Sequence, residues 1–209
     1  MTSSPEEGRR SHEPARTAGG LRARKKARTR AAIQREALRL FTENGYDATT
    51  VEQVAEAAEV APSTVFRYFP TKEDLVISDA YDPLVYAAFE AQPPELSVVQ
   101  ALRGALRSTL NDLSPEELAE GRERTALMLS VPALRGAGLG NFTATMMTVA
   151  DLVAKRIGRD PDDPRVRVFT GAVFGVMLDL MLRWAEDPEL DLATALDEAL
   201  AFLETGLPL

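Results

Sequence analysis

Apolar residues recur every three or four positions along most of this chain, and no stretch alternates apolar with polar residues as a half-buried strand does. Only 6% of the residues are aromatic, and alanine and leucine dominate the apolar set, which favours helices over sheets. The pattern predicts an all-α protein without internal repeats. Beyond residue 70, proline- and glycine-containing breaks, among them "RGAGLG" at 135–140, separate candidate helices at 72–81, 83–91, 97–112, 115–130, 141–158, 164–186 and 191–204.

The net charge of −8 is unevenly distributed along the chain. Residues 1–72 carry 13 Lys and Arg against 9 Asp and Glu, a net of +4, and the remainder carries 11 against 23, a net of −12. A basic segment followed by an acidic body is typical of a nucleic-acid-binding module joined to a second domain. We therefore predict a leader at 1–22, a DNA-binding domain at 23–72 and a second domain at 73–209.

The chain begins with a polar segment rich in Gly, Pro and Ser, which is typical of a disordered leader. The basic run "LRARKKARTR" follows at 21–30 and contributes Arg24, Lys25, Lys26 and Arg28 as candidate DNA contacts. We expect a flexible arm here that enters a minor groove or lies on phosphates. Short basic runs are a weak motif, and a solubilising tail is the alternative.

Three short helical segments follow the basic run. Asn44-Gly45 marks the end of the first, Thr49 or Thr50 caps the second, and Pro62 opens the third. This layout predicts a helix-turn-helix unit. The third helix carries small side chains at its leading end, as insertion into a major groove requires. Its candidate contacts, with one from the following segment, are Pro62, Ser63, Thr64, Arg67, Tyr68 and Lys72.

The stretch "AAIQREALRLFTENGYDATTVEQVAEAAEVAPSTVFRYFPTKEDL" resembles the DNA-binding head of the TetR family of transcriptional regulators. The resemblance covers about 45 positions, including Gly45-Tyr46, Thr49-Thr50, Tyr68-Phe69 and Lys72. It implies that Thr50 caps the second helix and touches phosphate, and we include Thr49 beside it as a candidate DNA contact. It further implies that Ser63, Thr64 and Arg67 face the groove while Lys72 holds the DNA backbone.

Two positions depart from the family pattern. Glu59 stands where the turn usually has glycine, so we expect a non-glycine residue with positive φ there, at a cost of roughly 1 kcal/mol. Phe66 stands where the family often has a tyrosine whose hydroxyl binds phosphate. We assign Phe66 to packing rather than to DNA contact.

Segment 164–186 is apolar on more than one side, so a helix there needs burial on several faces. With the final segment it predicts a two-fold four-helix interface, and the TetR resemblance implies the same kind of dimer. A core helix of a monomer is the alternative. The predicted interface residues are Gly171, Phe174, Gly175, Leu178, Leu192, Leu196, Leu200 and Leu203.

Methionine and aromatic side chains in the second domain suit an adaptable cavity for an apolar ligand, although for any single one of them ordinary core packing is the preferred alternative. The candidate ligand-binding residues are Met128, Phe142, Met146, Met147, Phe169, Met177, Met181 and Trp184. The layout "PALRG … DPDDPR … LRWAED" resembles the mycofactocin-regulator subgroup, which implies an acyl-CoA-like ligand. Arg124, Arg135 and Arg183 are candidates for its anionic part, unless they are solvated or paired with carboxylates.

The composition argues against several other functions. There is no cysteine, and His12 is the only histidine, so thiolate sites and histidine-based metal sites or catalytic triads are not expected. We expect no cofactor, no enzymatic activity, no membrane segment and a cytoplasmic location. The predicted function is a dimeric, ligand-responsive repressor with an operator DNA and a small-molecule effector as partners. An activator or a helical protein-interaction adaptor is the alternative.

Overall fold

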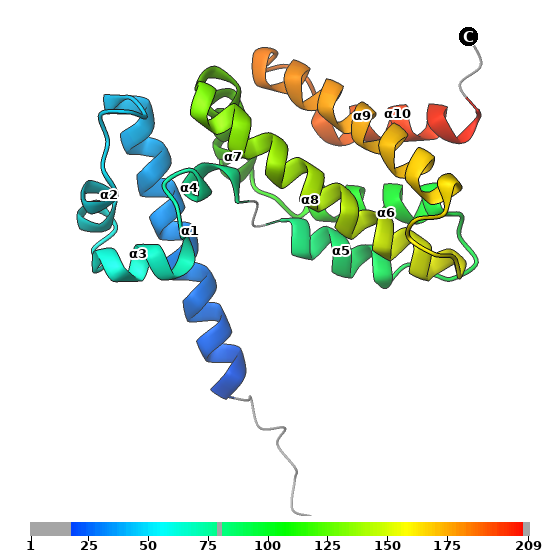
Figure 1. Ribbon diagram of the computed structural model, residues 1–209, viewed down its shortest axis with the longest axis horizontal. Helices are drawn as coiled ribbons and strands as arrows, with labels where there is room; N and C mark the ends of the chain where they lie inside the picture. The colour runs from blue at the N-terminus through cyan, green and yellow to red at the C-terminus, as the bar shows by residue number, and fades with distance from the viewer. Residues whose placement is uncertain (1–17, 79–80, 207–209) are drawn as a thin grey trace, which may run out of the picture.

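The computed structural model describes residues 18–78 and 81–206, with side chains from Arg28 onward. This part of the chain forms ten α-helices and no strand, which confirms the all-α prediction. We call α1–α3 the head and α5–α10 the body, and α4 links them (Figure 1). The helices are α1 Ala18–Asn44, α2 Val51–Ala57, α3 Pro62–Tyr68, α4 Asp74–Ile77, α5 Asp82–Glu90, α6 Val98–Asn111, α7 Pro115–Ser130, α8 Pro132–Ile157, α9 Pro164–Glu186 and α10 Leu192–Glu204.

Side-chain caps fix where several helices begin. Thr50, Ser97 and Ser114 each accept a hydrogen bond from a backbone N–H three residues on, and the Gln or Glu at that position returns one to the cap. These reciprocal bonds satisfy backbone donors that the first turn leaves free. Asp191 caps α10 through the N–H groups of Ala193 and Thr194. The helix starts are therefore encoded locally, within one turn of each cap.

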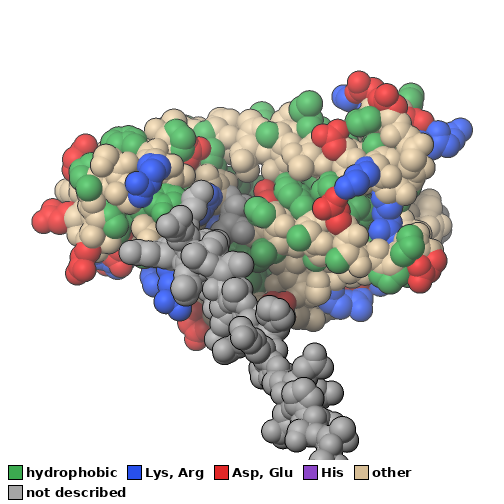
Figure 2. Space-filling view, turned by 90° about the horizontal axis from the view of Figure 1, so that it is seen from below, with side chains coloured by type: hydrophobic (Ala, Val, Ile, Leu, Met, Phe, Trp, Pro, Cys, Tyr) green, Lys and Arg blue, Asp and Glu red, His purple; other side chains and the backbone are tan. Residues whose placement is uncertain are grey.

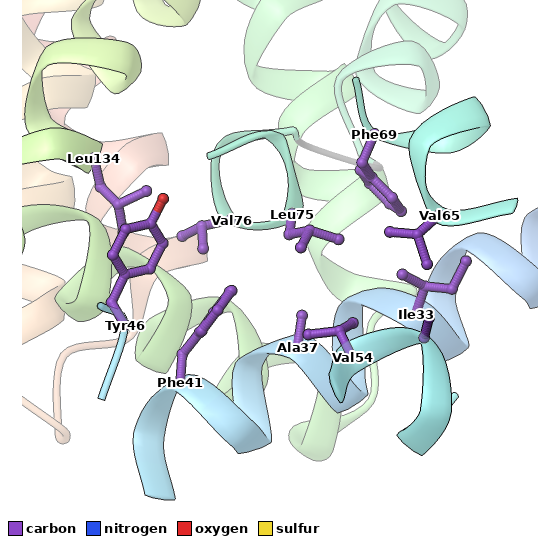
Figure 3. Close-up of a cluster of buried hydrophobic side chains, with 11 residues drawn as sticks. Ile33, Ala37, Phe41, Tyr46, Val54, Val65, Phe69, Leu75, Val76 and Leu134 are labelled. Atoms are coloured by element: carbon purple, nitrogen blue, oxygen red, sulfur yellow. The ribbon is translucent and has the colours of Figure 1, made fainter. Parts of the chain in front are cut away.

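The head has its own hydrophobic core, and that core reaches into the body (Figure 3). Three buried side chains of α1 meet α2, α3 and α4, and Leu134 of α8 closes the cluster at 0% exposure. Head and body are therefore packed against one another. The buried set is Ile33, Ala37, Phe41, Tyr46, Val54, Ala55, Val65, Phe69, Leu75, Val76 and Leu134.

The prediction of a break at 135–140 is wrong, because α8 runs without interruption from Pro132 to Ile157. Glycine is tolerated inside a helix at a modest cost, and one of these glycines has a packing reason. A Cβ on Gly138 would lie 3.0 Å from the sulfur of Met128. The glycine therefore lets α7 and α8 approach closely instead of ending the helix.

The helix predicted at 72–81 is also much shorter than expected. It spans only Asp74–Ile77, because the backbone of Ser78 turns to an extended conformation with φ −69° and ψ 112°. The other body helices begin and end within one residue of their predicted bounds, apart from α8. The connection between head and body is thus a short turn of helix rather than a long rod.

Helix α9 has the length and hydropathy of a membrane span, but it packs on α7, α8 and α10. It buries one face in the body, through Val166, Val173 and Phe174 among others. We therefore describe α9 as a core helix of the body with one uncovered side.

On the face of the molecule shown in Figure 2, acidic and basic side chains are interspersed with apolar ones.

Candidate DNA-binding face and effector cavity

Helix α3 divides into a face that supports the head and a face that is free. Val65 is 1% exposed, and Phe69, which follows the helix, is 0% exposed; both belong to the head core. Ser63 and Arg67 are exposed one turn apart on the other side. Pro62 is exposed as well, whereas Thr64 and Tyr68 are half-buried. The free face is small and polar at its leading end, as the sequence predicts for a groove-binding helix.

Phe66 lies on this free face, so its assignment to packing is wrong. Its side chain is 47% exposed, and around the helix Phe66 and Arg67 flank Ser63 on its two sides. The Arg67 guanidinium lies 5.3 Å from the centre of the Tyr68 ring, which limits its motion. Phe66 and Arg67 are therefore presented together, and the aromatic residue is available to a bound partner.

The turn between α2 and α3 adopts the strained form expected from the sequence. Glu59 has φ 53°, and it is the one non-glycine residue with positive φ in the described part of the chain. Its N–H donates to Glu56 at 3.0 Å, and the N–H of Val60 donates to Ala55 at 2.9 Å. These two bonds hold the turn, so the angle between the two short helices is fixed despite the missing glycine.

Thr49 and Thr50 have different roles. Thr50 is exposed, accepts from the Gln53 N–H at 3.2 Å and caps α2 as expected. Thr49 is 1% exposed, and its hydroxyl lies within hydrogen-bond distance of the Leu40 and Gly45 carbonyl oxygens, at 3.1 and 2.9 Å. A buried hydroxyl with these partners cannot reach DNA. The prediction of Thr49 as a DNA contact is therefore wrong.

Lys72 is held inside the head. Its ammonium donates to the carbonyl of Tyr46, lies 4.2 Å from the centre of the Tyr46 ring and lies 5.6 Å from that of Phe41. These contacts fasten the segment after α3 to the turn after α1. Lys72 has a structural role here, and its phosphate contact stays a prediction.

The basic run at 21–30 is part of α1, so the expectation of a flexible arm is wrong. The helix begins at Ala18 and its first turns extend beyond the rest of the head (Figure 1). Arg28 is exposed, and the side chains of Arg24, Lys25 and Lys26 lie outside the described residues. The Arg30 guanidinium stacks 4.9 Å from the centre of the Phe69 ring. His12 also lies outside the described residues.

The body contains a cavity of about 210 Å³, bordered by α4, α5, α6, α7, α8, α9 and α10. Five of the eight predicted ligand-binding side chains line it: Met128, Phe142, Met177, Met181 and Trp184. The other three do not. Phe169 and Met146 pack against the body core, and Met147 is 63% exposed on α8. Helical spacing identified apolar positions, but it could not distinguish the cavity from the core or the surface.

Part of the cavity wall comes from α4 and the start of α5, and no sequence motif predicted it. Val76 and Ile77 of α4, then Tyr81 and Asp82, border the cavity on the side of the head. Asp82 accepts a hydrogen bond from the Thr145 hydroxyl at 3.2 Å. The only signal was position, since these residues follow the helix-turn-helix directly. The segment that connects head and body therefore forms part of the cavity wall.

Of the three candidate arginines, only Arg124 lines the cavity. Arg135 is exposed, and Arg183 pairs with Asp179 at 3.7 Å on the surface. Around Arg124 the cavity also presents Asp82 and Glu117. The polar part of the cavity is therefore mixed in charge, and most of its wall is apolar.

For the three residues of α9 that are exposed among the predicted dimer contacts, the role in a dimer stays a prediction. Gly171, Gly175 and Leu178 are exposed, and a Cβ on either glycine would meet nothing within 4 Å. The predictions for Phe174 and for three residues of α10 are wrong, because these side chains are buried in the chain's own body. The buried residues are Phe174 at 3%, Leu192 at 6%, Leu196 at 4% and Leu200 at 0% exposure, whereas Leu203 is partly buried against the body core.

Among the residues whose side chains are described, no group of three or more His, Asp or Glu is placed to hold a metal ion. Charged side chains of the body form ion pairs with one another. The carboxylate of Asp197 on α10 forms ion pairs with two arginines of α6, Arg103 at 2.8 Å and Arg107 at 2.6 Å. These two guanidinium groups lower the pKa of Asp197 to about 2. This cluster joins two helices and lies on neither the α3 face nor the cavity wall.

Comparison with known proteins gives two family matches. Residues 33–78 match the model described as "Bacterial regulatory proteins, tetR family", and residues 96–208 match the "MftR C-terminal domain". The chain is similar to the HTH-type transcriptional regulator TcmR of Streptomyces glaucescens, with 40% identity over 162 residues, 74% of this chain and 72% of that protein. The two family matches together cover most of the head and of the body, but not residues 18–32 or 79–95.

Two solved structures share the fold. NalD, the secondary repressor of the MexAB-OprM multidrug efflux pump in Pseudomonas aeruginosa, has a TM-score of 0.57 at 21% identity, covering 88% of this chain and 97% of that one. FadR of Thermus thermophilus, a repressor solved with lauroyl-CoA, has a TM-score of 0.52 at 26% identity, covering 86% and 95%. Both align over nearly the whole of their own length.

Proposed function

The chain belongs to the TetR family of transcriptional regulators, which are typically ligand-responsive repressors, and on that premise we propose how it works. It binds a pseudo-palindromic operator as a dimer in the cytoplasm and leaves the DNA when an apolar or acyl-CoA-like small molecule fills the body cavity. The observation that carries this proposal is the position of the cavity. Val76 belongs to the head core and also lines the cavity, so one side chain is common to both.

DNA recognition is assigned to the free face of α3. Ser63 and Arg67 reach base edges or phosphates, and Phe66 contributes apolar contact with a base such as a thymine methyl group. Thr50 keeps its hydroxyl hydrogen available for a phosphate, because its oxygen accepts the capping bond. The basic N-terminal turns of α1 carry Arg24, Lys25, Lys26 and Arg28 along the phosphate backbone as a rigid helix.

The uncovered side of α9 supports the dimer. Val168 is 74% exposed, Leu178 45% and Leu182 42%, and with Gly171 and Gly175 they follow one another at helical spacing. An apolar stripe of this length is unfavourable in water. The two glycines let a second α9 approach closely, so we propose that two copies pack through this stripe. In such a dimer the recognition helices enter successive major grooves about 34–36 Å apart.

The cavity sets the class of effector. Its volume of about 210 Å³ exceeds the roughly 150 Å³ of an engineered apolar cavity that binds benzene. Leucine, methionine and aromatic side chains form most of the wall, so the bulk of the ligand is apolar. The FadR relative was solved with lauroyl-CoA, which supports a ligand with an acyl chain.

Effector action follows from linkage. A ligand that binds more tightly to a conformer with different head spacing lowers operator affinity by the same factor. Because Val76 and Met128 border the cavity and pack against the head core, a ligand that displaces them also displaces the head. The proposed domain boundary between residues 72 and 73 therefore separates a DNA-binding domain from a ligand-binding domain, and the side chains of the two domains pack against each other.

A fluorescence anisotropy titration tests the function directly. The purified protein is titrated onto DNA from upstream of its own gene and onto random DNA at the same salt concentration. A preference of roughly 10³ or more for the upstream DNA supports specific recognition. Lauroyl-CoA and uncharged apolar compounds are then added to the complex. If no duplex selected from a random library binds specifically, the regulator proposal fails and a protein-interaction role takes its place.

A further inference from the structure

A second, smaller cavity of about 110 Å³ adjoins the first, between α1 of the head and α7 of the body. Five residues border both cavities: Val76, Tyr81, Glu117, Gly121 and Arg124. We propose that the two are compartments of one effector site, in which the smaller compartment takes an uncharged hydrogen-bonding end of the ligand. This inference rests on the proposed function and deepens it, since of the two ligand classes proposed above it favours an apolar molecule with an uncharged polar end over an acyl-CoA.

The size of the smaller compartment limits what it can hold. At about 110 Å³ it has only about half the volume of the larger compartment, which is about 210 Å³. It therefore accommodates an end group and not a whole effector. The larger compartment holds the apolar body, and the shared wall at Gly121 and Arg124 is where one passes into the other.

The charges of the lining specify an uncharged group. Arg35 and Arg124 contribute two positive charges, and Glu117 and Glu120 contribute two negative ones. Arg35 already pairs with Glu120, at 3.2 Å. A further anion or cation brought into this balanced set would meet a like charge for every opposite one, and against the buried Leu38, Leu75 and Val76 it would lose hydration, which costs free energy. A phenol or alcohol avoids that cost, because it can donate to a carboxylate and accept from a guanidinium.

The position of the compartment has a mechanistic consequence. Ala31, Gln34, Arg35 and Leu38 of α1 form one side, and α7 forms the other. A ligand end placed here touches the head itself, without the linker as intermediary. The side chain of Gln34 also donates to the Ser78 carbonyl at 2.9 Å, so this side of α1 is tied to the end of α4. The ligand then acts as a wedge between α1 and α7.

The test uses two probes that differ only at one end. 4-Hydroxybiphenyl carries a phenol, which like tyrosine is uncharged at pH 7, and biphenyl-4-carboxylate carries an anion. Each is titrated calorimetrically into the full-length protein and into Ala31→Phe, which fills the smaller compartment from an exposed position on α1. Thr42→Phe is the matched control. It places the same ring on an exposed position of α1 about 16 Å further along.

We expect the phenol to bind the wild-type protein at least about tenfold more tightly than the carboxylate. Ala31→Phe is expected to weaken phenol binding by at least about tenfold, whereas Thr42→Phe leaves it unchanged. Equal binding to both variants would place the ligand wholly in the body and overturn the proposal. So would a carboxylate that binds as tightly as the phenol, or a phenol that does not bind the wild-type protein. Operator titrations of the same proteins report separately whether the proposed function holds.

Discussion

Arg35 of α1 and Glu120 of α7 form an ion pair of 3.2 Å that joins the head directly to the body. Both side chains are substantially exposed, at 61% and 44%, so water and salt screen the pair. A pair of this kind contributes between zero and roughly 1 kcal/mol. It steadies the position of the head without locking it, which is compatible with the head movement proposed above.

Replacing Arg35 with leucine is therefore expected to have a small, specific effect. Operator affinity falls by no more than about fivefold, because roughly 1 kcal/mol is the upper limit for an exposed pair. Arg39→Leu is the charge-matched control, since among the described side chains Arg39 pairs with Glu36 and Glu43, both within α1. Anisotropy titrations of both variants check this. A loss above about tenfold for Arg35→Leu alone would give the pair a different role, such as direct DNA contact.

The strained turn at Glu59 yields a stability prediction. Glycine adopts φ 53° without the penalty that a side chain imposes, so Glu59→Gly is expected to stabilise the protein by roughly 1 kcal/mol. For a chain of this size that is a rise in Tm of about 2–4 °C. Glu56→Gly, in the regular part of α2, should lower stability by a similar amount. Calorimetry showing the same sign for both variants would contradict this explanation.

The exposed face of α3 predicts a separation of DNA binding from stability. Arg67→Ala is expected to reduce discrimination between operator and random DNA by roughly 1–3 kcal/mol. Phe66→Ser should also weaken operator binding while leaving Tm nearly unchanged, because the ring is already 47% exposed. Arg165→Ala removes an exposed positive charge at the start of α9 and is the control. Should Phe66→Ser unfold the head or leave operator binding intact, the assignment of the face would be wrong.

The apolar stripe on α9 predicts a dimer that a single charge disrupts. Leu178→Glu puts a carboxylate in the proposed contact, so sedimentation equilibrium is expected to show monomers with an unchanged circular dichroism spectrum. Leu139→Glu is the matched control, since Leu139 is 67% exposed on α8 outside the stripe. If both variants remain dimers, the interface lies elsewhere.

The Asp197 cluster predicts a component of acid sensitivity. Its folded-state pKa of about 2 lies below the ordinary value of 3.8. The ion pairs of Asp197 with Arg103 and Arg107 therefore contribute their full share of the free energy of unfolding above about pH 4. This contribution is lost as the pH falls toward 2. Asp197→Asn should lower stability at neutral pH and flatten its decline between pH 4 and 2. Asp151→Asn, at an exposed position of α8, is the control, and equal pH profiles for the two variants would refute the assignment.

The sequence predicted the helices well where the signals are local. Caps such as Thr50 and Ser114 lie within one turn of the helix that they begin, whereas the positive φ of Glu59 was expected from the TetR resemblance, which usually has glycine at that turn position. The break expected at 135–140 failed for a reason that is not local. Gly138 accommodates Met128 of another helix, and no pattern within α8 reveals that neighbour.

The candidate site shows the same limit. Thr49 and Thr50 are adjacent and chemically identical, yet one hydroxyl is buried against α1 and the other is exposed. Phe66 is apolar and was expected inside, but the register of α3 turns it outward because Val65 and Phe69 fill the core. Periodicity finds a buried face, whereas the choice between cavity, core and dimer stripe depends on tertiary contacts.

The double use of Val76 and Met128 constrains how a protein of this design can change its effector over evolutionary time. Both side chains border the cavity and pack against the head core, so a substitution there that improves the fit of a new ligand also alters the platform that carries α3. Met181 and Leu192 border the same cavity from α9 and α10, and neither is part of the head core. We expect relatives that bind different effectors to differ mainly at the cavity wall formed by α9 and α10. The part of the wall that also belongs to the head core should change little.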